Sequence, residues 1–440
     1  MDGMTMNPKL PEAFVSRMQR QLGNELPAFL LALEAPPVRG IRLNMLKETD
    51  ATEAFRQYPR IPWVKEAYEL PSESEAGSTI LHEAGAFYLQ EPGAMLPAAI
   101  LDAKPGERIL DLCAAPGGKS TQIGIAMENQ GLLVCNEPVS KRARILSRNI
   151  ERIGLTHTIV TSARPEELTL RWTEGFDAVL VDAPCSGEGM FRRVPESRNE
   201  WTEEKARGCV QRQREILNAA AGMVRPGGRI VYSTCTYNPE ENDGNADWFL
   251  QEHEDFEPEA FSIGGIEAPE GRYTCYPHRL ATEGQYAARF RRKGDGTPRE
   301  SEDRSLPKAQ KEEAAALAGL FPGLPEATHR LGTTLVHLDQ CPDLRGIRIL
   351  RAGLHLGEVR GKIAIPDHAA AMSAGPTDSR ILDVPAEQAC RYTAGETIEA
   401  DPEGWVLVRY KGLILGWGKG SGGILRNHYP KGLRNSHLIP

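Results

Sequence analysis

Five short apolar runs, separated by segments with helical spacing, most constrain the fold of this chain. Each run is too short for a helix and is rich in Val, Ile and Leu, as strands buried on both faces are. Alternation of such strands with helices is typical of a mostly parallel sheet covered on both sides. We therefore predict a doubly wound α/β domain over residues 76–295. The runs are 108–113, 132–136, 158–161, 178–182 and 229–234.

A glycine-rich turn, Asp111-Leu-Cys-Ala-Ala-Pro-Gly-Gly-Lys-Ser120, follows the first run. Such a turn between a strand and a helix lets the backbone approach a ligand closely. It is not a P-loop, because Cys113 stands where the first glycine is required, and the dinucleotide pattern Gly-x-Gly-x-x-Gly also fails. Glu137 ends the second run, where α/β domains place an acid that accepts hydrogen bonds from ribose hydroxyls. The two features indicate a nucleoside-like cofactor, with a tight turn that binds nothing as the alternative.

Eight cysteines are spread along the chain, and none forms a Cys-x-x-Cys pair. We therefore expect neither a zinc cluster nor a disulfide framework, and no metal site. The first residues, MDGMTMNPKLPEAF, lack the apolar segment of a signal peptide, and no uncharged apolar run reaches the ~18 residues of a membrane span. A cytoplasmic protein with reduced thiols and no membrane contact is expected. The cysteines are Cys113, Cys135, Cys185, Cys209, Cys235, Cys275, Cys341 and Cys390.

Two of these thiols differ from the rest in their context. For most cysteines, inert packing is the default interpretation. Cys185 and Cys235, however, each follow the carboxyl end of a predicted strand, at the sheet edge where ligands bind. Asn238-Pro239-Glu240 has the pattern of an N-cap and first turn, and the positive end of that helix would favour a thiolate at Cys235. Such a thiolate is a candidate nucleophile.

Three motifs, in this order along the chain, give it a specific resemblance: 111–119, Asp182-Ala-Pro-Cys-Ser-Gly187 and Ser233-Thr-Cys-Thr-Tyr237. Together with Arg42-Leu-Asn-Met-Leu-Lys47 and Gln90-Glu-Pro-Gly-Ala-Met95, they closely resemble the Nol/Nop/Sun family of RNA cytosine-5 methyltransferases, which use S-adenosylmethionine. Gly353-Leu-His-Leu-Gly-Glu358, Gly416-Trp-Gly-Lys419 and Lys431-Gly-Leu-Arg434 are similar to the F type of bacterial small-subunit ribosomal RNA methyltransferases, whose C-terminal part is PUA-like and binds RNA.

The resemblance implies roles for individual residues. Cys235 is the expected nucleophile, Cys185 assists release of the methylated product, and Asp182 hydrogen-bonds the base and also contacts the cofactor. After the third strand the family often has an acid, whereas this chain reads Thr161-Ser162-Ala-Arg164, so Ser162 is our choice there, with Arg164 as the alternative. The other residues implied in cofactor binding are Cys113, Ala114, Ala115, Pro116, Gly117, Gly118, Lys119 and Glu137.

Flanking segments complete the predicted organisation. Residues 1–75 form an N-terminal RNA-binding domain with two short helices in 11–34 and a strand near 40–47, and 296–328 form a linker with a short helix at 309–319. Residues 329–440 form a β-rich, PUA-like domain, and 285–290 form a final antiparallel strand of the catalytic domain. The net charge of −8 speaks against nucleic acid, but residues 403–440 carry a local charge of +5. The average therefore leaves room for an RNA partner.

We predict a Rossmann-like, S-adenosylmethionine-dependent enzyme that forms 5-methylcytosine in RNA, with small-subunit ribosomal RNA as the first choice of substrate. The expected state is a monomer. Methylation of tRNA is one alternative, and a non-catalytic RNA-binding factor in ribosome assembly is another. The presence of both Cys185 and Cys235 disfavours the second alternative, because a scaffold needs neither thiol at a strand end.

Overall fold

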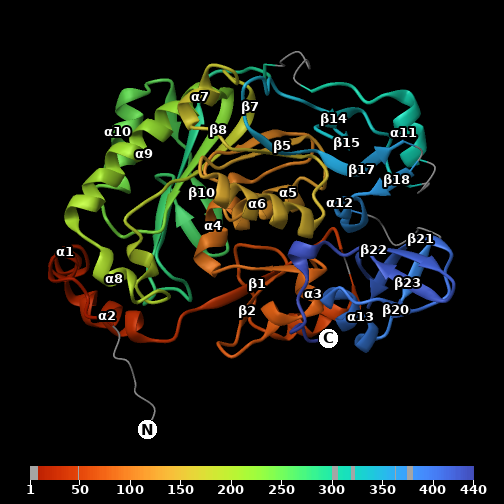
Figure 1. Ribbon diagram of the computed structural model, residues 1–440. Coiled ribbons are helices and arrows are strands. Elements are labelled where there is room, and N and C mark those ends of the chain that lie inside the picture. The colour runs from red at the N-terminus through yellow and green to blue at the C-terminus, as the bar shows by residue number, and fades with distance from the viewer. Residues whose placement is uncertain (1–7, 48, 300–305, 319–322, 362, 374–379) are drawn as a thin grey trace, which may run out of the picture.

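A computed structural model (Figure 1) describes residues 8–47, 49–299, 306–318, 323–361, 363–373 and 380–440. Its central element is a mixed sheet in the order β12-β13-β8-β7-β4-β5-β6-β16, with β9 paired to β13. Strands β8, β7, β4, β5 and β6 run parallel, and β13 is antiparallel to β8. The predicted doubly wound sheet and its antiparallel strand are therefore confirmed. The strands are β4 (Arg108–Asp111), β5 (Leu132–Asn136), β6 (Thr158–Thr161), β7 (Phe176–Asp182), β8 (Val224–Thr234), β9 (Phe256–Pro258), β12 (Arg272–Cys275), β13 (Gln285–Arg292) and β16 (Ile349–Ala352).

Helices cover both faces of this sheet, because successive strand residues point to opposite sides. In β4, Ile109 belongs to an apolar cluster with Ile123 and Leu146, whereas Leu110 belongs to a second cluster with Leu217. Helices α4, α5 and α6 therefore lie on one face, and α7, α9 and α10 on the other (Figure 1). The helices are α4 (Pro92–Leu101), α5 (Gly118–Ala126), α6 (Ser140–Ile153), α7 (Pro165–Thr169), α8 (Ser197–Glu200), α9 (Glu203–Met223) and α10 (Asp243–Glu252).

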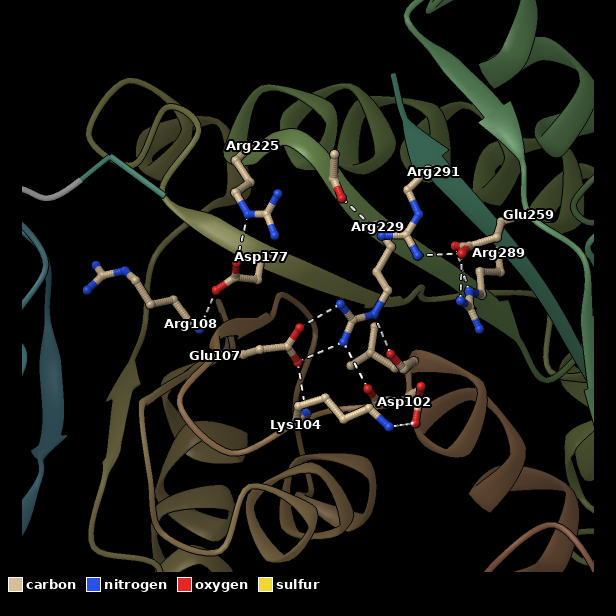
Figure 2. A network of polar contacts seen from close by, with 12 residues as sticks. Asp102, Lys104, Glu107, Arg108, Asp177, Arg225, Arg229, Glu259, Arg289 and Arg291 are labelled. Atoms are coloured by element: carbon tan, nitrogen blue, oxygen red, sulfur yellow. Dashed lines mark hydrogen bonds and ion pairs between the residues drawn. The ribbon is translucent and has the colours of Figure 1, made fainter. Parts of the chain in front are cut away.

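Ion pairs link the parallel strands at the amino-terminal edge of the sheet, opposite to the edge where these strands end (Figure 2). Arg229 of β8 donates two hydrogen bonds to Glu107, with N···O distances of 2.7 and 2.8 Å, and it also caps the backbone oxygen of Leu101. Asp177 accepts from the backbone N–H of Arg108 and from Arg225, and so joins the starts of β4, β7 and β8. Bidentate and bridging pairs of this kind fix strand ends in one register. The carboxyl ends of the same strands are thereby positioned as a rigid group.

The N-terminal unit packs partly on the catalytic domain. The predicted helix pair is confirmed as α1 (Glu12–Leu22) and α2 (Leu26–Glu34), and its apolar face contacts Phe191, Trp201 and Tyr237. A three-stranded sheet β2-β1-β3 follows. Its third strand lies beyond residue 76, so this unit extends past the boundary that we predicted. The other elements are β1 (Arg39–Leu43), β2 (Ala67–Leu70), α3 (Ile80–Glu83) and β3 (Phe87–Leu89).

The C-terminal third, predicted as a β-rich domain over 329–440, forms two further sheets. One sheet has the order β14-β15-β17-β18, the other β19-β21-β22-β23-β20, and β16 instead joins the catalytic sheet antiparallel to β6. The helix predicted within the linker is confirmed as α11, which packs on β17 and β18. Alternating apolar residues identify strands but not the sheet that each strand joins. The elements are α11 (Lys311–Ala318), β14 (His329–Leu331), β15 (Thr334–His337), β17 (Leu354–Arg360), β18 (Ile363–Pro366), α12 (His368–Met372), β19 (Ile381–Asp383), α13 (Ala386–Ala394), β20 (Ile398–Glu399), β21 (Gly404–Tyr410), β22 (Leu413–Ser421) and β23 (Ile424–Asn427).

Strands β10 (Phe261–Ile263) and β11 (Ile266–Ala268) form a small hairpin. Among the residues that the structure describes, no helix is both long and apolar enough to cross a membrane.

Candidate active site

A cavity of about 820 Å³ lies at the carboxyl edge of β4, β5, β7 and β8. Parallel strands bring their carboxyl ends to one sheet edge, which is where α/β folds bind ligands. Most of the residues predicted for the site meet there although they are far apart in the sequence. The predicted residues that line the cavity are Cys113, Ala114, Ala115, Pro116, Gly118, Lys119, Glu137, Asp182, Cys185 and Cys235.

The conformation of the glycine-rich loop depends on Gly117 and on a buried arginine beneath the loop. Gly117 has a φ of 115°, which an L side chain rarely adopts, and it caps α5 without lining the cavity. Arg42, from the N-terminal motif, is buried beneath the loop. Its Nη2 donates to the backbone oxygen of Gly118 at 3.0 Å and to Thr121 Oγ1 at 2.9 Å. The N-terminal unit therefore holds the start of α5 in place.

Two buried acids face the cavity from β4 and β5. Asp111 Oδ2 accepts from Ser120 Oγ at 2.6 Å, whereas its Oδ1 is buried without a hydrogen-bond partner among the described residues. Burial raises the pKa of Asp111 to about 7. Glu137 accepts from the backbone N–H of Val139 at 2.9 Å and pairs with Arg142 at 3.2 Å. An unpartnered carboxylate oxygen and an acid at the tip of β5 fit the ammonium and ribose groups of a cationic nucleoside.

After β6 the cavity wall differs from our first choice. Ser162 does not line the cavity, and its hydroxyl lies 3.3 Å from both Ser140 Oγ and the backbone oxygen of Pro138. Arg164 and Pro165 form the wall at this position instead. The chain turns after Thr161, so that a residue further along faces inward.

Asp182, at the end of β7, is held by two partners. Its Oδ2 lies 2.7 Å from Lys119 Nζ, and its Oδ1 accepts from Ser233 Oγ at 2.7 Å. Burial lowers the pKa of Lys119, but the charge of Asp182, its hydrogen bond to Lys119 and the nearby Cys235 side chain outweigh that effect, so the net shift is upward. Lys119 therefore keeps its proton and provides a positive charge close to both groups.

The two thiols lie side by side. Cys185 Sγ and Cys235 Sγ are 3.2 Å apart, and the backbone N–H of Cys235 donates to Cys185 Sγ at 3.3 Å. The contact with Cys235, together with burial, raises the pKa of Cys185 well above its ordinary value. Cys185 therefore holds its proton and can donate it in a hydrogen bond to Cys235 Sγ.

One element near these thiols begins later than predicted. Helix α10 starts at Asp243, whereas residues 239–242 form a turn in which Asn238 Oδ1 accepts from the backbone N–H of Glu240 at 3.2 Å. The Asn-Pro pattern therefore caps a turn and does not open the helix. Lys119, rather than a helix end, supplies the positive charge near Cys235.

Several lining residues were not identified from the sequence. They come from the segment after β3, from the loop after Cys185, from α9 and from the start of β13, and Arg193 and Arg212 are exposed arginines at the cavity wall. A lone arginine on a helix carries no sequence signal that separates a ligand contact from a solvated surface. These residues include Gln90, Met190, Arg193, Arg212 and Gln285.

The fold, the acid at the tip of β5 and the cavity at the carboxyl edge of the sheet define a class: S-adenosylmethionine-dependent methyltransferases. Models of known families match most of the chain. "16S rRNA methyltransferase RsmB/F" matches residues 98–291, and the N-terminal domain of 16S rRNA methyltransferase RsmF matches 10–92. The first C-terminal domain of RsmF matches 316–373, and the RsmF PUA domain matches 379–435.

Full-length relatives agree with these matches. Ribosomal RNA small subunit methyltransferase F of Aliivibrio fischeri is 32% identical, with 98% of this chain and 99% of that protein covered. The protein of the same name in Cronobacter sakazakii is 31% identical, with 96% of each chain covered. The chain therefore belongs to the RsmF family of 16S rRNA methyltransferases, which use S-adenosylmethionine.

Solved structures share the catalytic fold. A methyltransferase homologue from Pyrococcus horikoshii is 29% identical and covers 64% of this chain and 95% of its own length, with a TM-score of 0.56. NSun6 from the same organism, solved with SFG, is 22% identical with a TM-score of 0.57, and covers 65% of this chain and 99% of that one. The second likeness concerns the fold alone.

Proposed function

We propose that this enzyme methylates carbon 5 of a cytosine in small-subunit ribosomal RNA through a covalent bond to Cys235. The observation that carries the proposal is the pair of touching thiols beside Asp182 and Lys119 in one cavity. Carbon 5 of cytosine is a poor nucleophile. Addition of a thiolate to carbon 6 makes carbon 5 enamine-like, so a methyltransferase without a redox group needs a nucleophile of this kind.

The cofactor pocket supports this chemistry. When bound, S-adenosylmethionine supplies the methyl group as an electrophile. Asp111 and Glu137 are the acids that would hold its polar ends, and the loop from Cys113 to Lys119 would line its remaining surface. Asp111 Oδ1 has no other described partner, which favours a cationic ligand group at that oxygen.

Each residue at the reacting centre has a distinct task. Cys235 attacks carbon 6, and Lys119 provides a positive charge in the same cavity. Asp182 retains free lone pairs beside those taken by Lys119 and Ser233, with which it accepts a hydrogen bond from the N4 amino group of the base. Cys185 donates a hydrogen bond to Cys235 Sγ, and so stabilises this sulfur as it leaves the methylated base.

Single-cysteine variants test the roles of the two thiols. Cys235→Ala is expected to abolish methyl transfer and to form no adduct, whereas Cys185→Ala is expected to accumulate a covalent protein–RNA adduct. Both are measured on a denaturing gel after incubation with RNA and S-adenosylmethionine. Cys209→Ala is the matched control, because Cys209 lies on α9 outside the cavity lining. An adduct with Cys235→Ala and none with Cys185→Ala would reverse the assignment.

The substrate is tested separately. Bisulfite sequencing of RNA from a deletion strain and its parent is expected to show the loss of 5-methylcytosine in small-subunit ribosomal RNA. Loss confined to tRNA would favour the alternative substrate. An RNA target agrees with the PUA match at 379–435, which includes most of the basic C-terminal residues.

A further inference from the structure

A buried carboxylate lies directly behind the two thiols. Glu241, in the turn between β8 and α10, is fully buried and accepts four hydrogen bonds from neutral donors. Ser186 supplies two of them, from its backbone N–H at 2.9 Å and from its hydroxyl at 2.5 Å. The side-chain amides of Gln213 and Asn238 supply the others, at 2.9 and 3.1 Å.

This carboxylate joins the two loops that carry the thiols. Ser186 is the neighbour of Cys185, and Thr236 is the neighbour of Cys235. The hydroxyls of Ser186 and Thr236 are 2.8 Å apart. The single hydroxyl proton of Ser186 goes to Glu241, so the Ser186 oxygen can accept from Thr236. A chain of hydrogen bonds therefore runs from Thr236 through Ser186 to Glu241.

The two thiols depend on this chain to different degrees. Cys235 directly follows β8, whose register with β7 and β13 fixes its backbone. Cys185 lies in a loop without regular structure, and the backbone N–H next to it is held by Glu241. Loss of the carboxylate would therefore move Cys185 more than Cys235.

We propose that Glu241 is a positioning residue that holds Cys185 against Cys235 for release of the methylated base. The inference rests on the proposed function. At release the carbon 5 proton leaves to water, and its electron pair forms the C5=C6 double bond. The bond between Cys235 Sγ and carbon 6 breaks, and Cys235 departs as a thiolate that the Cys185 S–H meets with a hydrogen bond. A displaced Cys185 cannot assist this step, whereas attack by Cys235 is retained.

Glu241→Gln and Ser186→Ala test the inference. Single-turnover reactions on a denaturing gel give the rate of adduct formation and the rate of adduct decay separately. We expect decay to slow by about tenfold or more, while formation changes by less than about threefold. Ser186→Thr retains the hydroxyl and is expected to restore decay. An equal loss in both rates would overturn the inference, because a merely structural role affects the whole site.

A double variant shows whether Glu241 acts through Cys185. In the Cys185→Ala background, Glu241→Gln is expected to slow adduct decay no further, because the effects of substituting residues that act as one unit are not additive. Additive slowing would contradict the inference. If Cys185→Ala alone forms no adduct, the proposed covalent mechanism fails instead, and the two failures are distinguishable. Circular dichroism and thermal melting identify a variant that has lost its fold, in which case Ser186→Ala decides.

Discussion

At the scale of single residues, Asp111 shows a conflict between stability and binding. Its carboxyl is fully buried, and burial raises its pKa from 3.8 to about 7. Because the folded-state pKa lies above the unfolded value, the contribution to stability is complete below pH 3.8 and is lost as the pH rises through about 7. At neutral pH and above, the ligand-free protein therefore carries a poorly solvated charge that a cationic ligand group would compensate.

The substitution Asp111→Asn separates the two effects. Between about pH 5 and about pH 8 the unfolding free energy of the variant is expected to rise relative to wild type by about 2 kcal/mol. The variant is also expected to bind S-adenosylmethionine more weakly. We expect wild type to lose affinity below about pH 7, where Asp111 becomes protonated, and the variant to show no such loss. Urea unfolding and titration calorimetry measure these effects, with the exposed Asp401→Asn as control. Tight binding by Asp111→Asn at pH 8 would contradict the contact.

Much of the site could be predicted at this scale, because motif residues at strand ends must meet at one edge of a parallel sheet. Cys185 and Cys235 were predicted in this way, whereas Asp182 and Lys119 followed from the family resemblance. The residue that faces the cavity after β6 could not be predicted, because the turn of the chain after Thr161 decides between Ser162 and Arg164. Glu241 was also missed as a candidate, because a buried acid with neutral partners has the same sequence signature as an exposed one.

At the scale of elements, helix α9 contributes a charge to the cavity that the sequence does not distinguish. Arg212 and Arg207 are both exposed on this helix, and only Arg212 lines the cavity. Five residues correspond to a rotation of about 140° around a helix axis, so the two side chains leave different faces. We expect the lining arginine to contact an RNA phosphate near the target base.

Arg212→Ala is therefore expected to weaken RNA binding and to reduce the slope of log K against log salt by about 1. Fluorescence anisotropy with a small-subunit ribosomal RNA fragment, over a series of salt concentrations, measures both quantities. Arg207→Ala removes the same charge from another face of the helix and is the matched control. Equal effects of the two substitutions would indicate general attraction rather than a contact at the cavity.

The boundaries of elements show where local sequence signals end. Asn238-Pro239 is a sound helix-start pattern, yet α10 begins at Asp243. The carboxylate of Glu241 instead collects donors from Ser186, Gln213 and Asn238, which the helical conformation would not bring together. Tertiary hydrogen bonds of a buried charge outweigh a capping preference of about 1 kcal/mol.

At the scale of the whole molecule, the catalytic sheet is completed by a strand from the C-terminal third. β16 covers the edge of β6, and Arg351 of β16 pairs with Glu151 of α6. Glu151 also lies 2.8 Å from His368 Nδ1 of α12. The sequence did not predict this arrangement, because edge pairing depends on contacts between residues about 200 positions apart, and helix α12 was not predicted within the β-rich segment. Covering the edge also prevents its pairing with another chain.

His157 directly precedes β6 and lies near the sheet β14-β15-β17-β18. It lines a cavity of about 240 Å³ together with His337 and Leu338. Its Nδ1 is 3.0 Å from Asn129 Oδ1, and because an amide oxygen only accepts, Nδ1 carries the proton. Nε2 is left buried without a hydrogen-bond partner among the described residues. Burial lowers the pKa of His157 to about 4.

Protonation of His157 is therefore expected to oppose folding in mild acid. Since the folded-state pKa lies below the ordinary 6.5, this stability is complete above pH 6.5 and is lost as the pH falls towards about 4, by up to about 3 kcal/mol. His157→Asn keeps a donor for Asn129 but does not titrate. Urea unfolding between about pH 7 and about pH 5 should therefore show a smaller loss for the variant. Other histidines titrate in both proteins, so the difference between the two pH profiles isolates His157, and parallel profiles would contradict its role at this junction.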